Sequence, residues 1–212
     1  MSQIFSELDA LVLRATPYGD NSAYLLVLSR QHGKVMLRAR GARRRKSPLL
    51  AFVEPLVYAR FSVFDYRERL TINDAEAHSF FVPLRSDVRK LALATYMADV
   101  ADVVADGDRQ DDALLRLMLT ALHKLSGTQY TLEHIKAVFE WRIAAIAGYQ
   151  LEAPQGLSSD RVKAIHHSQT APTERAFSFV VSDDDWRDEA EDYLQTHLAH
   201  AFESLVFYKR LS

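Results

Sequence analysis

The first 80 residues alternate between apolar and polar positions, and turn-forming residues separate the alternating runs. Successive side chains of a β-strand point to opposite faces, so this period of two predicts strands with one face in a core. Pro17, Gly19 and Asp20 mark one turn, and His32 with Gly33 marks a short connection before the third run. The predicted strands are 8–16, 22–29, 34–40, 56–64 and 70–77.

From residue 83 onward, apolar residues recur every three or four positions, which is typical of α-helices with one buried face. The segment 83–107 carries an apolar stripe of Leu93, Met97, Val100 and Val104. Further helices are predicted at 111–127, 131–147 and 157–168, and 177–181 is predicted as strand or extended chain. Ser182 followed by Asp185 has the form of a capping box, and the last long helix behind it has a stripe from Trp186 to Ala201.

This order of elements predicts an α+β chain with two domains. Five short strands in about 80 residues suit a small OB-like β-barrel, and an SH3-like barrel fits the same pattern. We therefore expect the barrel at 1–80 and an all-helical domain at 81–212. A chain of 212 residues is long enough for each domain to have its own core.

Charge is distributed unevenly along the chain, although the net charge is only −2. Residues 1–82 contain 12 Lys and Arg against 8 Asp and Glu, a net of +4, whereas the remaining residues contain 14 against 20, a net of −6. Clustered cations raise the local concentration of a polyanion whatever the total charge. The N-terminal domain is therefore expected to bind a nucleic acid, and the acidic helical domain is expected to serve protein interaction.

The composition also excludes several kinds of chemistry. Cysteine is absent, which excludes disulfides, thiolate zinc sites and cysteine nucleophiles. No apolar run approaches the ~18 residues of a membrane span, and residues 1–9 lack the basic and apolar regions of a secretory signal. We therefore expect a cytoplasmic protein with no membrane partner.

The densest chemical feature lies between Asp20 and Glu54, where the sequence has eight bases and no acid. On a strand face and its adjoining loop, such a run would follow phosphates and release their counterions. The alternative interpretation is a solvated loop without a ligand. The predicted DNA-binding residues are Lys34, Arg38, Arg40, Arg43, Arg44, Arg45 and Lys46. Bases could stack on Tyr24, Phe61, Phe64 or Tyr66, although most of these aromatic residues are expected in the barrel core.

The other candidate sites favour structural roles. Asp99, Asp102 and Asp106 share a helix face, but this face lies opposite the apolar stripe and is expected in solvent rather than at a metal ion. The histidine pairs lack a third ligand at zinc-site spacing, and no GxGxxG, Walker or GxSxG motif occurs. We therefore expect no catalytic residue, no metal, no cofactor and no enzymatic activity.

Several short motifs resemble one protein family. In order along the chain they are DALVLR at 9–14, YGD at 18–20, HGK at 32–34, RGARR at 40–44 with Lys46 and Ser47, FE at 139–140, AGY at 147–149 and ESLVF at 203–207. Together they resemble the RecO family of recombination mediators. The resemblance covers nearly the whole chain, and the HGK and RGARR motifs are its most specific part.

The resemblance implies an OB domain followed by a helical domain and a function without catalysis. It implies binding to single- and double-stranded DNA, annealing of complementary strands, and cooperation with RecR to load RecA onto DNA coated with SSB. It also implies DNA repair and homologous recombination in the bacterial cytoplasm, on the nucleoid. Many family members carry a four-cysteine zinc module after the Gly-Tyr pair, and this chain has no cysteine there.

In the family, the helical domain receives the acidic C-terminal tail of SSB, which ends in a carboxylate beside a Phe. A receptor for such a tail needs an apolar groove with one or two cations at its rim. Lys136 and Arg142 flank Phe139 and Glu140 and are the predicted partner-binding cations, with Phe139 expected in the core. The alternative is that both cations only solvate their helix. The competing interpretation is that the chain is an OB-fold protein that binds RNA or is associated with translation.

Overall fold

The computed structural model describes residues 5–65, 69–107, 112–150, 159–179 and 185–211 of the chain. Tyr66 and Ser182, which the sequence marked for a stacking role and a helix cap, lie outside these ranges. The chain forms two compact units. One unit comprises Met1–Phe81 with Ala105–Leu115, and the other comprises Val82–Val104 with Arg116–Ser212.

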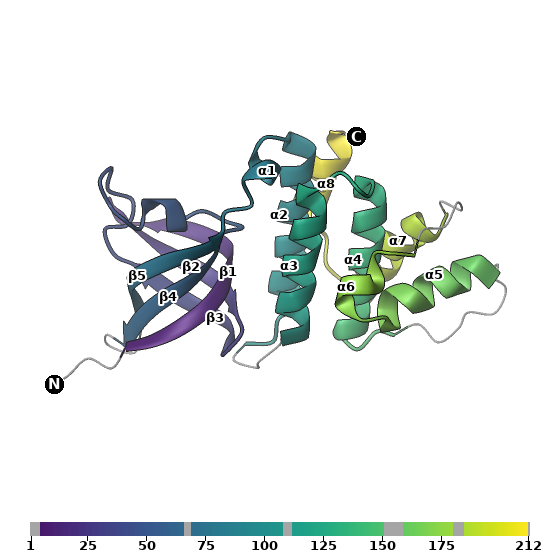
Figure 1. The fold of residues 1–212 in the computed structure, drawn as a ribbon, viewed down its shortest axis with the longest axis horizontal. Coiled ribbons are helices and arrows are strands. Elements are labelled where there is room, and N and C mark those ends of the chain that lie inside the picture. Colours follow the sequence, from purple (N-terminus) through teal and green to yellow (C-terminus); the bar gives the residue numbers. More distant parts are fainter. Residues whose placement is uncertain (1–4, 66–68, 108–111, 151–158, 180–184, 212) are drawn as a thin grey trace. The chain divides into compact units, whose positions relative to one another are not determined.

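Five strands close into a barrel in the first unit (Figure 1). They are β1 (Phe5–Tyr18), β2 (Ser22–Ser29), β3 (Gly33–Ala39), β4 (Tyr58–Asp65) and β5 (Leu70–Ser79). Their order around the barrel is β1-β2-β3-β5-β4. All neighbouring strands are antiparallel except β3 and β5, which meet as a parallel pair at Arg38 and Thr71. This barrel confirms the OB-like fold that the alternating pattern predicted.

The long strand β1 joins the two halves of the barrel. Its first half pairs with β4 and its second half pairs with β2. The register slips between Val12 and Arg14, so that Leu13 is an extra residue on β1. Such a bulge bends and twists a strand, which allows β1 to close the barrel on both sides. Alternate side chains of all five strands fill the interior, among them Leu8, Leu25, Leu37, Phe61 and Ile72.

The helices in the described ranges are α1 (Val82–Arg85), α2 (Val88–Val104), α3 (Asp112–Ser126), α4 (Leu132–Ile146), α5 (Ser159–Thr170), α6 (Thr173–Ala176), α7 (Asp185–Leu198) and α8 (Glu203–Arg210). In the second unit, α4 packs against α2, α5 and α7, while α8 packs against α2. Helix α4 is buried nearly all round, as expected for a helix at the centre of a core. Thr131 caps its first turn by accepting a hydrogen bond from the His134 N–H at 3.2 Å.

Three predicted elements were wrong in their extent or type. The helix expected at 83–107 is two helices, because Asp87 accepts the Arg89 and Lys90 N–H groups and starts α2 afresh. The last long helix ends at Leu198, since Ala199 has a left-handed φ of 47° and the chain then forms the separate helix α8. Residues 177 and 178 form a turn rather than a strand or extended chain, and residues 180 and 181 of this prediction lie outside the described ranges.

Candidate nucleic-acid interface

The outward side chains of β1, β2 and β3 form one face of the barrel. The register places Tyr24 opposite Thr16 of β1 and opposite Arg38 of β3. The neighbouring row consists of Arg14, Leu26 and Met36. We call this surface the β1–β3 face and define it by Arg14, Thr16, Tyr18, Tyr24, Met36 and Arg38. It combines aromatic and aliphatic side chains with guanidinium groups.

Two tyrosines and two arginines form a cluster at this face. The ring centres of Tyr18 and Tyr24 are 4.9 Å apart, and the ring planes are tilted by 54°. The guanidinium carbon of Arg38 lies 5.5 Å from the centre of the Tyr18 ring, within cation–π range. Arg69 Nη1 donates a hydrogen bond to the Tyr24 hydroxyl at 3.1 Å. The two rings are thus held between two guanidinium groups.

A pocket of about 590 Å³ opens beside the cluster. Its lining residues are Thr16, Tyr24, Val35, Met36, Arg38, Arg69 and Leu70. The parallel contact between β3 and β5 brings Leu70 and Arg69 next to Arg38, because Arg38 pairs with Thr71. The volume falls in the range of ~300–1,000 Å³ that is typical of small-molecule sites. The site therefore has an aliphatic and aromatic wall with two cations.

The loop after β3 carries four consecutive exposed cations, Arg43 to Lys46. Its backbone is held in place because the Gly41 N–H donates to Ser22 Oγ at 3.1 Å and the Arg43 N–H donates to the Asn21 carbonyl at 3.0 Å. Gly41 has a φ of 63°, a conformation that favours glycine. Among the described residues, no carboxylate forms an ion pair with any of these four cations. We call residues 40–46 the cationic loop.

Acidic residues gather on a different face of the barrel, formed by β1, β4 and β5. Asp9 Oδ1 lies 2.7 Å from His78 Nε2 and 3.1 Å from Arg60 Nε. Burial tends to raise the pKa of Asp9, but the hydrogen bonds from His78 and Arg60 outweigh it and hold the pKa below its usual value. Glu7 and Glu76 are also next to Arg60. The acids of β1, β4 and β5 thus neutralise local cations and leave the charge of the cationic loop intact.

The structure places the seven predicted DNA-binding residues in two neighbouring groups. Lys34 and Arg38 lie on β3, and the other five belong to the cationic loop. The loop begins beside Ser22, which pairs with Tyr18, so it leaves the sheet at the end where the tyrosines lie. Of the aromatic candidates, Tyr24 is on the β1–β3 face, whereas Phe61 is fully buried in the core.

The sequence analysis missed several residues of this site, among them Tyr18, Arg14 and Arg69. Tyr18 lies between Pro17 and Gly19, and the pattern marks this segment only as a turn. Arg14 belongs to the period-two pattern of β1, which would place it on the outer surface but gives no reason to single it out. Arg69 reaches the site only through the β3–β5 pairing. The sequence offered a signal at Arg14, through the alternation, and at Tyr18, which belongs to the YGD motif.

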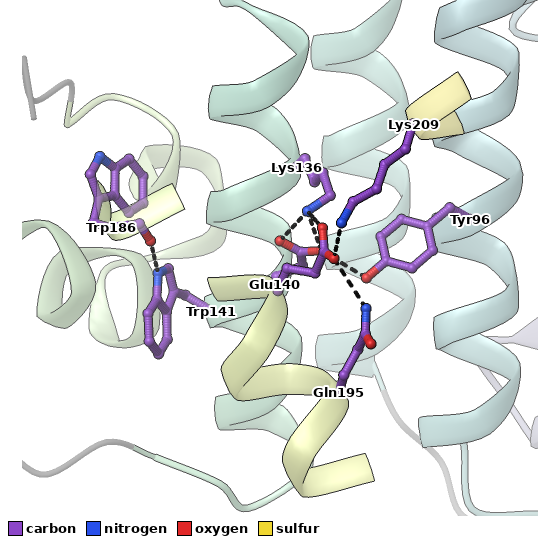
Figure 2. Close-up of polar contacts among 8 residues, drawn as sticks. Tyr96, Lys136, Glu140, Trp141, Trp186, Gln195 and Lys209 are labelled. Atoms are coloured by element: carbon purple, nitrogen blue, oxygen red, sulfur yellow. Dashed lines mark hydrogen bonds and ion pairs between the residues drawn. The ribbon is translucent and has the colours of Figure 1, made fainter. Parts of the chain in front are cut away.

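Lys136 lies inside the helical unit rather than on an exposed rim. Its ammonium nitrogen is 2.8 Å from Glu140 Oε1 (Figure 2) and 2.8 Å from Glu191 Oε2. Burial alone would lower the pKa of Lys136, but the two carboxylates outweigh it and raise the pKa. The side chain of Lys136 is only 10% exposed. This position differs from the groove rim that we expected, and a partner contact at Lys136 stays a prediction.

Arg142 is partly exposed on α4 and is already hydrogen-bonded within the unit. Its Nη1 donates to the Gln169 carbonyl, and its Nη2 lies 3.5 Å from the Thr173 hydroxyl. Burial lowers the pKa of its guanidinium. Phe139 is fully buried, as expected for a core residue. The role of Arg142 in partner binding likewise stays a prediction.

Within the described ranges, no group of three His, Cys, Asp or Glu side chains could hold a metal ion. A four-thiolate zinc site cannot form anywhere in the chain, because the sequence has no cysteine. None of the described helices is both long enough and apolar enough to span a bilayer.

Comparisons with known proteins match both units. Residues 1–81 match the family model described as "Recombination protein O N terminal", and residues 85–161 match the model "Recombination protein O C terminal". The chain belongs to the RecO family. Membership in this family agrees with the resemblance that the short motifs indicated. The two most specific motifs lie in the candidate interface, HGK at the beginning of β3 and RGARR in the cationic loop.

Curated relatives in the RecO family carry the name "DNA repair protein RecO". The protein of Alkaliphilus metalliredigens is 33% identical over 66% of this chain and 57% of its own length. The protein of Acetivibrio thermocellus is 31% identical over 66% of this chain and 55% of its own length. The protein of Symbiobacterium thermophilum is 29% identical over 73% of this chain and 62% of its own length. The matched part of the chain thus spans a little over half the length of these relatives.

Proposed function

We propose that this chain binds single- and double-stranded DNA through the β1–β3 face and the cationic loop, and that it acts in DNA repair and homologous recombination. The observation that carries the proposal is the separation of charge on the barrel. Four exposed loop cations without a carboxylate partner lie beside an aromatic face, and the acids pair with cations on β1, β4 and β5. The name of the relatives, "DNA repair protein RecO", supports the same function.

The proposed mechanism is annealing without bond cleavage. Two complementary strands repel each other through their phosphates, and cations that neutralise both strands lower this barrier. Base pairing then supplies the driving force. No group in this mechanism has to act as an acid, base or nucleophile, so the proposal includes no catalytic residue and no cofactor.

The partners follow from the same proposal. We propose that the chain cooperates with RecR to load RecA onto DNA coated with SSB, in the bacterial cytoplasm on the nucleoid. The acidic helical unit would receive the SSB tail. Arg142 supports this role because it is partly exposed, whereas the burial of Lys136 between Glu140 and Glu191 weighs against a direct contact with the tail.

The test of DNA binding is a variant in which Arg43, Arg44, Arg45 and Lys46 are all replaced by Ala. The slope of log affinity against log salt should fall by ~0.7–0.9 for each phosphate contact removed, or ~3 for all four. The control is Arg60→Ala, which removes a cation from the face formed by β1, β4 and β5 and should leave the slope unchanged. An unchanged slope in a folded quadruple variant would place the DNA site elsewhere.

The mediator role needs a separate assay. The wild-type chain should anneal complementary oligonucleotides coated with SSB faster than they anneal alone, and the quadruple variant should lose most of this acceleration. Measuring the affinity for single-stranded DNA, duplex DNA and RNA of equal length addresses the competing function. Stronger binding to RNA than to either form of DNA would favour an RNA-binding protein instead.

A further inference from the structure

The pocket on the β1–β3 face has a composition that phosphate binding alone does not require. Met36 and Tyr18 are 52% and 46% exposed, which places them among the most exposed large apolar side chains of the described residues. Both lie on the face that carries Arg38. Single exposed apolar residues are common on protein surfaces, but here Met36 lines the pocket and Tyr18 contacts two other lining residues, Tyr24 and Arg38.

The aromatic rings of the site are fixed before any ligand arrives. The Tyr24 hydroxyl accepts a hydrogen bond from Arg69, and the Tyr18 ring is in contact with the Tyr24 ring and with Arg38. A ring that is already held loses little conformational freedom when a second ring stacks on it. The cluster therefore resembles a stacking platform rather than loose surface side chains.

We propose that this pocket accepts an unpaired base of a single-stranded nucleic acid. The base would stack on the tyrosine pair against Met36, while Arg38 and Arg69 would meet the phosphates on either side of it. An apolar wall between two cations complements a flat, uncharged base between two phosphates. This proposal rests on the proposed function, because it assigns the base contacts of the same DNA-binding face.

The cationic loop indicates a strand rather than a free nucleotide as the occupant. Its four exposed cations continue from the end of the sheet beside Tyr18 and extend the positive surface beyond the pocket. A single nucleotide in the pocket would leave them without a ligand. A duplex would present its bases stacked and paired, and extracting one base means breaking both its stacking and its pairing. The pocket would therefore favour single strands over duplexes.

The experiment compares two ligands for the full chain by fluorescence anisotropy, a labelled oligothymidine and an abasic strand with the same number of phosphates. The measured quantity is the ratio of the two affinities. In the wild type this ratio should be well above one, because only oligothymidine has bases to stack. Replacing Tyr18 with Ala and Tyr24 with Leu should lower the ratio by about 5- to 150-fold for one base that no longer stacks.

Two further variants separate stacking from effects on folding. Tyr24→Phe keeps the ring and removes only the hydroxyl that contacts Arg69, so it should retain most of the ratio. Met36→Ala changes an exposed side chain whose loss should leave the barrel folded, and it should lower the ratio in the same direction as the tyrosine variant.

The outcomes distinguish the failure of this proposal from the failure of DNA binding itself. A wild-type ratio near one, with salt-dependent binding of both strands, would overturn the base pocket and leave the proposed function standing. The same conclusion would follow if the folded tyrosine variant kept the full ratio. If the wild type bound neither strand, the proposed function would fail and the pocket proposal with it.

Discussion

Glu140 is a fully buried carboxylate at the centre of a polar network between four helices. Tyr96 of α2 donates its hydroxyl to Glu140 Oε1 at 2.7 Å, and Lys136 lies one turn away on α4 (Figure 2). Glu191 and Gln195 of α7 and Lys209 of α8 complete the network. A buried charge is costly unless it is paired and hydrogen-bonded, so these contacts are required for the carboxylate to remain in the core.

The position of Glu140 makes the stability of the chain depend on pH. Burial raises its pKa from 4.5 to about 7, and the ion pair with Lys136 and the hydrogen bond from Tyr96 offset only part of this effect. Between these two pH values the folded protein holds a proton that the unfolded chain has released. The stabilisation from this proton is therefore complete below pH 4.5 and is lost as the pH rises through about 7.

We predict that Glu140→Gln removes this loss, because the amide cannot release a proton. The free energy of unfolding, measured by urea denaturation from pH 4.5 to 8, should fall less with rising pH in the variant than in the wild type. Glu191→Gln is the matched control, since contacts with Lys136 and Lys209 outweigh burial and lower the pKa of Glu191. Its stabilisation is lost only as the pH falls below 4.5, so between pH 4.5 and 8 the control should lose stability with rising pH as the wild type does. If the free energy of unfolding fell equally with pH in the wild type and in Glu140→Gln, Glu140 would not be the group responsible.

At the residue scale, the sequence predicted which segments carry clustered charges better than it predicted whether a single charged side chain is buried. The cations of the loop were predicted correctly as an exposed run, because consecutive charges can only be accommodated in solvent or at a ligand. Lys136 was expected at a rim and is buried, because α4 is covered nearly all round and its apolar pattern has no clear solvent side. The carboxylates that pair with Lys136 include Glu191, which is distant in sequence, and no local pattern indicates that pairing.

At the scale of elements, the strands were predictable because each has one face in the barrel core. The helix boundaries were less so. Phe81, directly before α1, and Ala199, directly after α7, both have a left-handed φ although neither is glycine. Sequence reasoning looks for Gly or Pro at such positions, and here tertiary packing imposes the conformation instead.

The start of α2 offers a test of this correction. Asp87 accepts hydrogen bonds from the N–H groups of Arg89 at 3.0 Å and Lys90 at 3.2 Å, the geometry of an N-cap. We predict that Asp87→Ala lowers the free energy of unfolding by ~1 kcal/mol, within a range of ~0.5–2. Asp99→Ala, which removes the same charge from the middle of the helix, should be neutral or slightly stabilising. Equal effects of the two substitutions in urea denaturation would show that Asp87 is not a cap.

At the scale of the whole molecule, the candidate site is assembled from distant parts of the barrel. Tyr18, Tyr24 and Arg38 come from three successive strands, and Arg69 joins them only because β5 lies parallel to β3. The sequence could predict the strands, the charge asymmetry and the cationic run. It could not predict the pocket, because a pocket depends on which strands are neighbours in the closed barrel.

The barrel core is a second property of the whole molecule that the structure makes testable. Among the described residues, the buried side chains of this core lie between Leu8 and Ile72, so a fragment 1–81 would keep all of them. A fragment of these residues would lose the hydrogen bond from the Lys34 N–H to the Gly107 carbonyl, which is 2.9 Å long and contributes a net ~0.5–1.5 kcal/mol. We therefore expect the fragment to fold but to be less stable than the barrel of the full chain.

Circular dichroism of the fragment 1–81 should show β-structure and one cooperative transition in urea. The fragment should also bind single-stranded DNA with the same salt slope as the full chain, because the β1–β3 face and the cationic loop lie within it. The quadruple Ala variant of the fragment controls for non-specific binding and should lose ~3 from that slope. A fragment without a cooperative transition would mean that the barrel depends on the rest of the chain. A folded fragment with a smaller slope would mean that part of the DNA-binding surface lies outside residues 1–81.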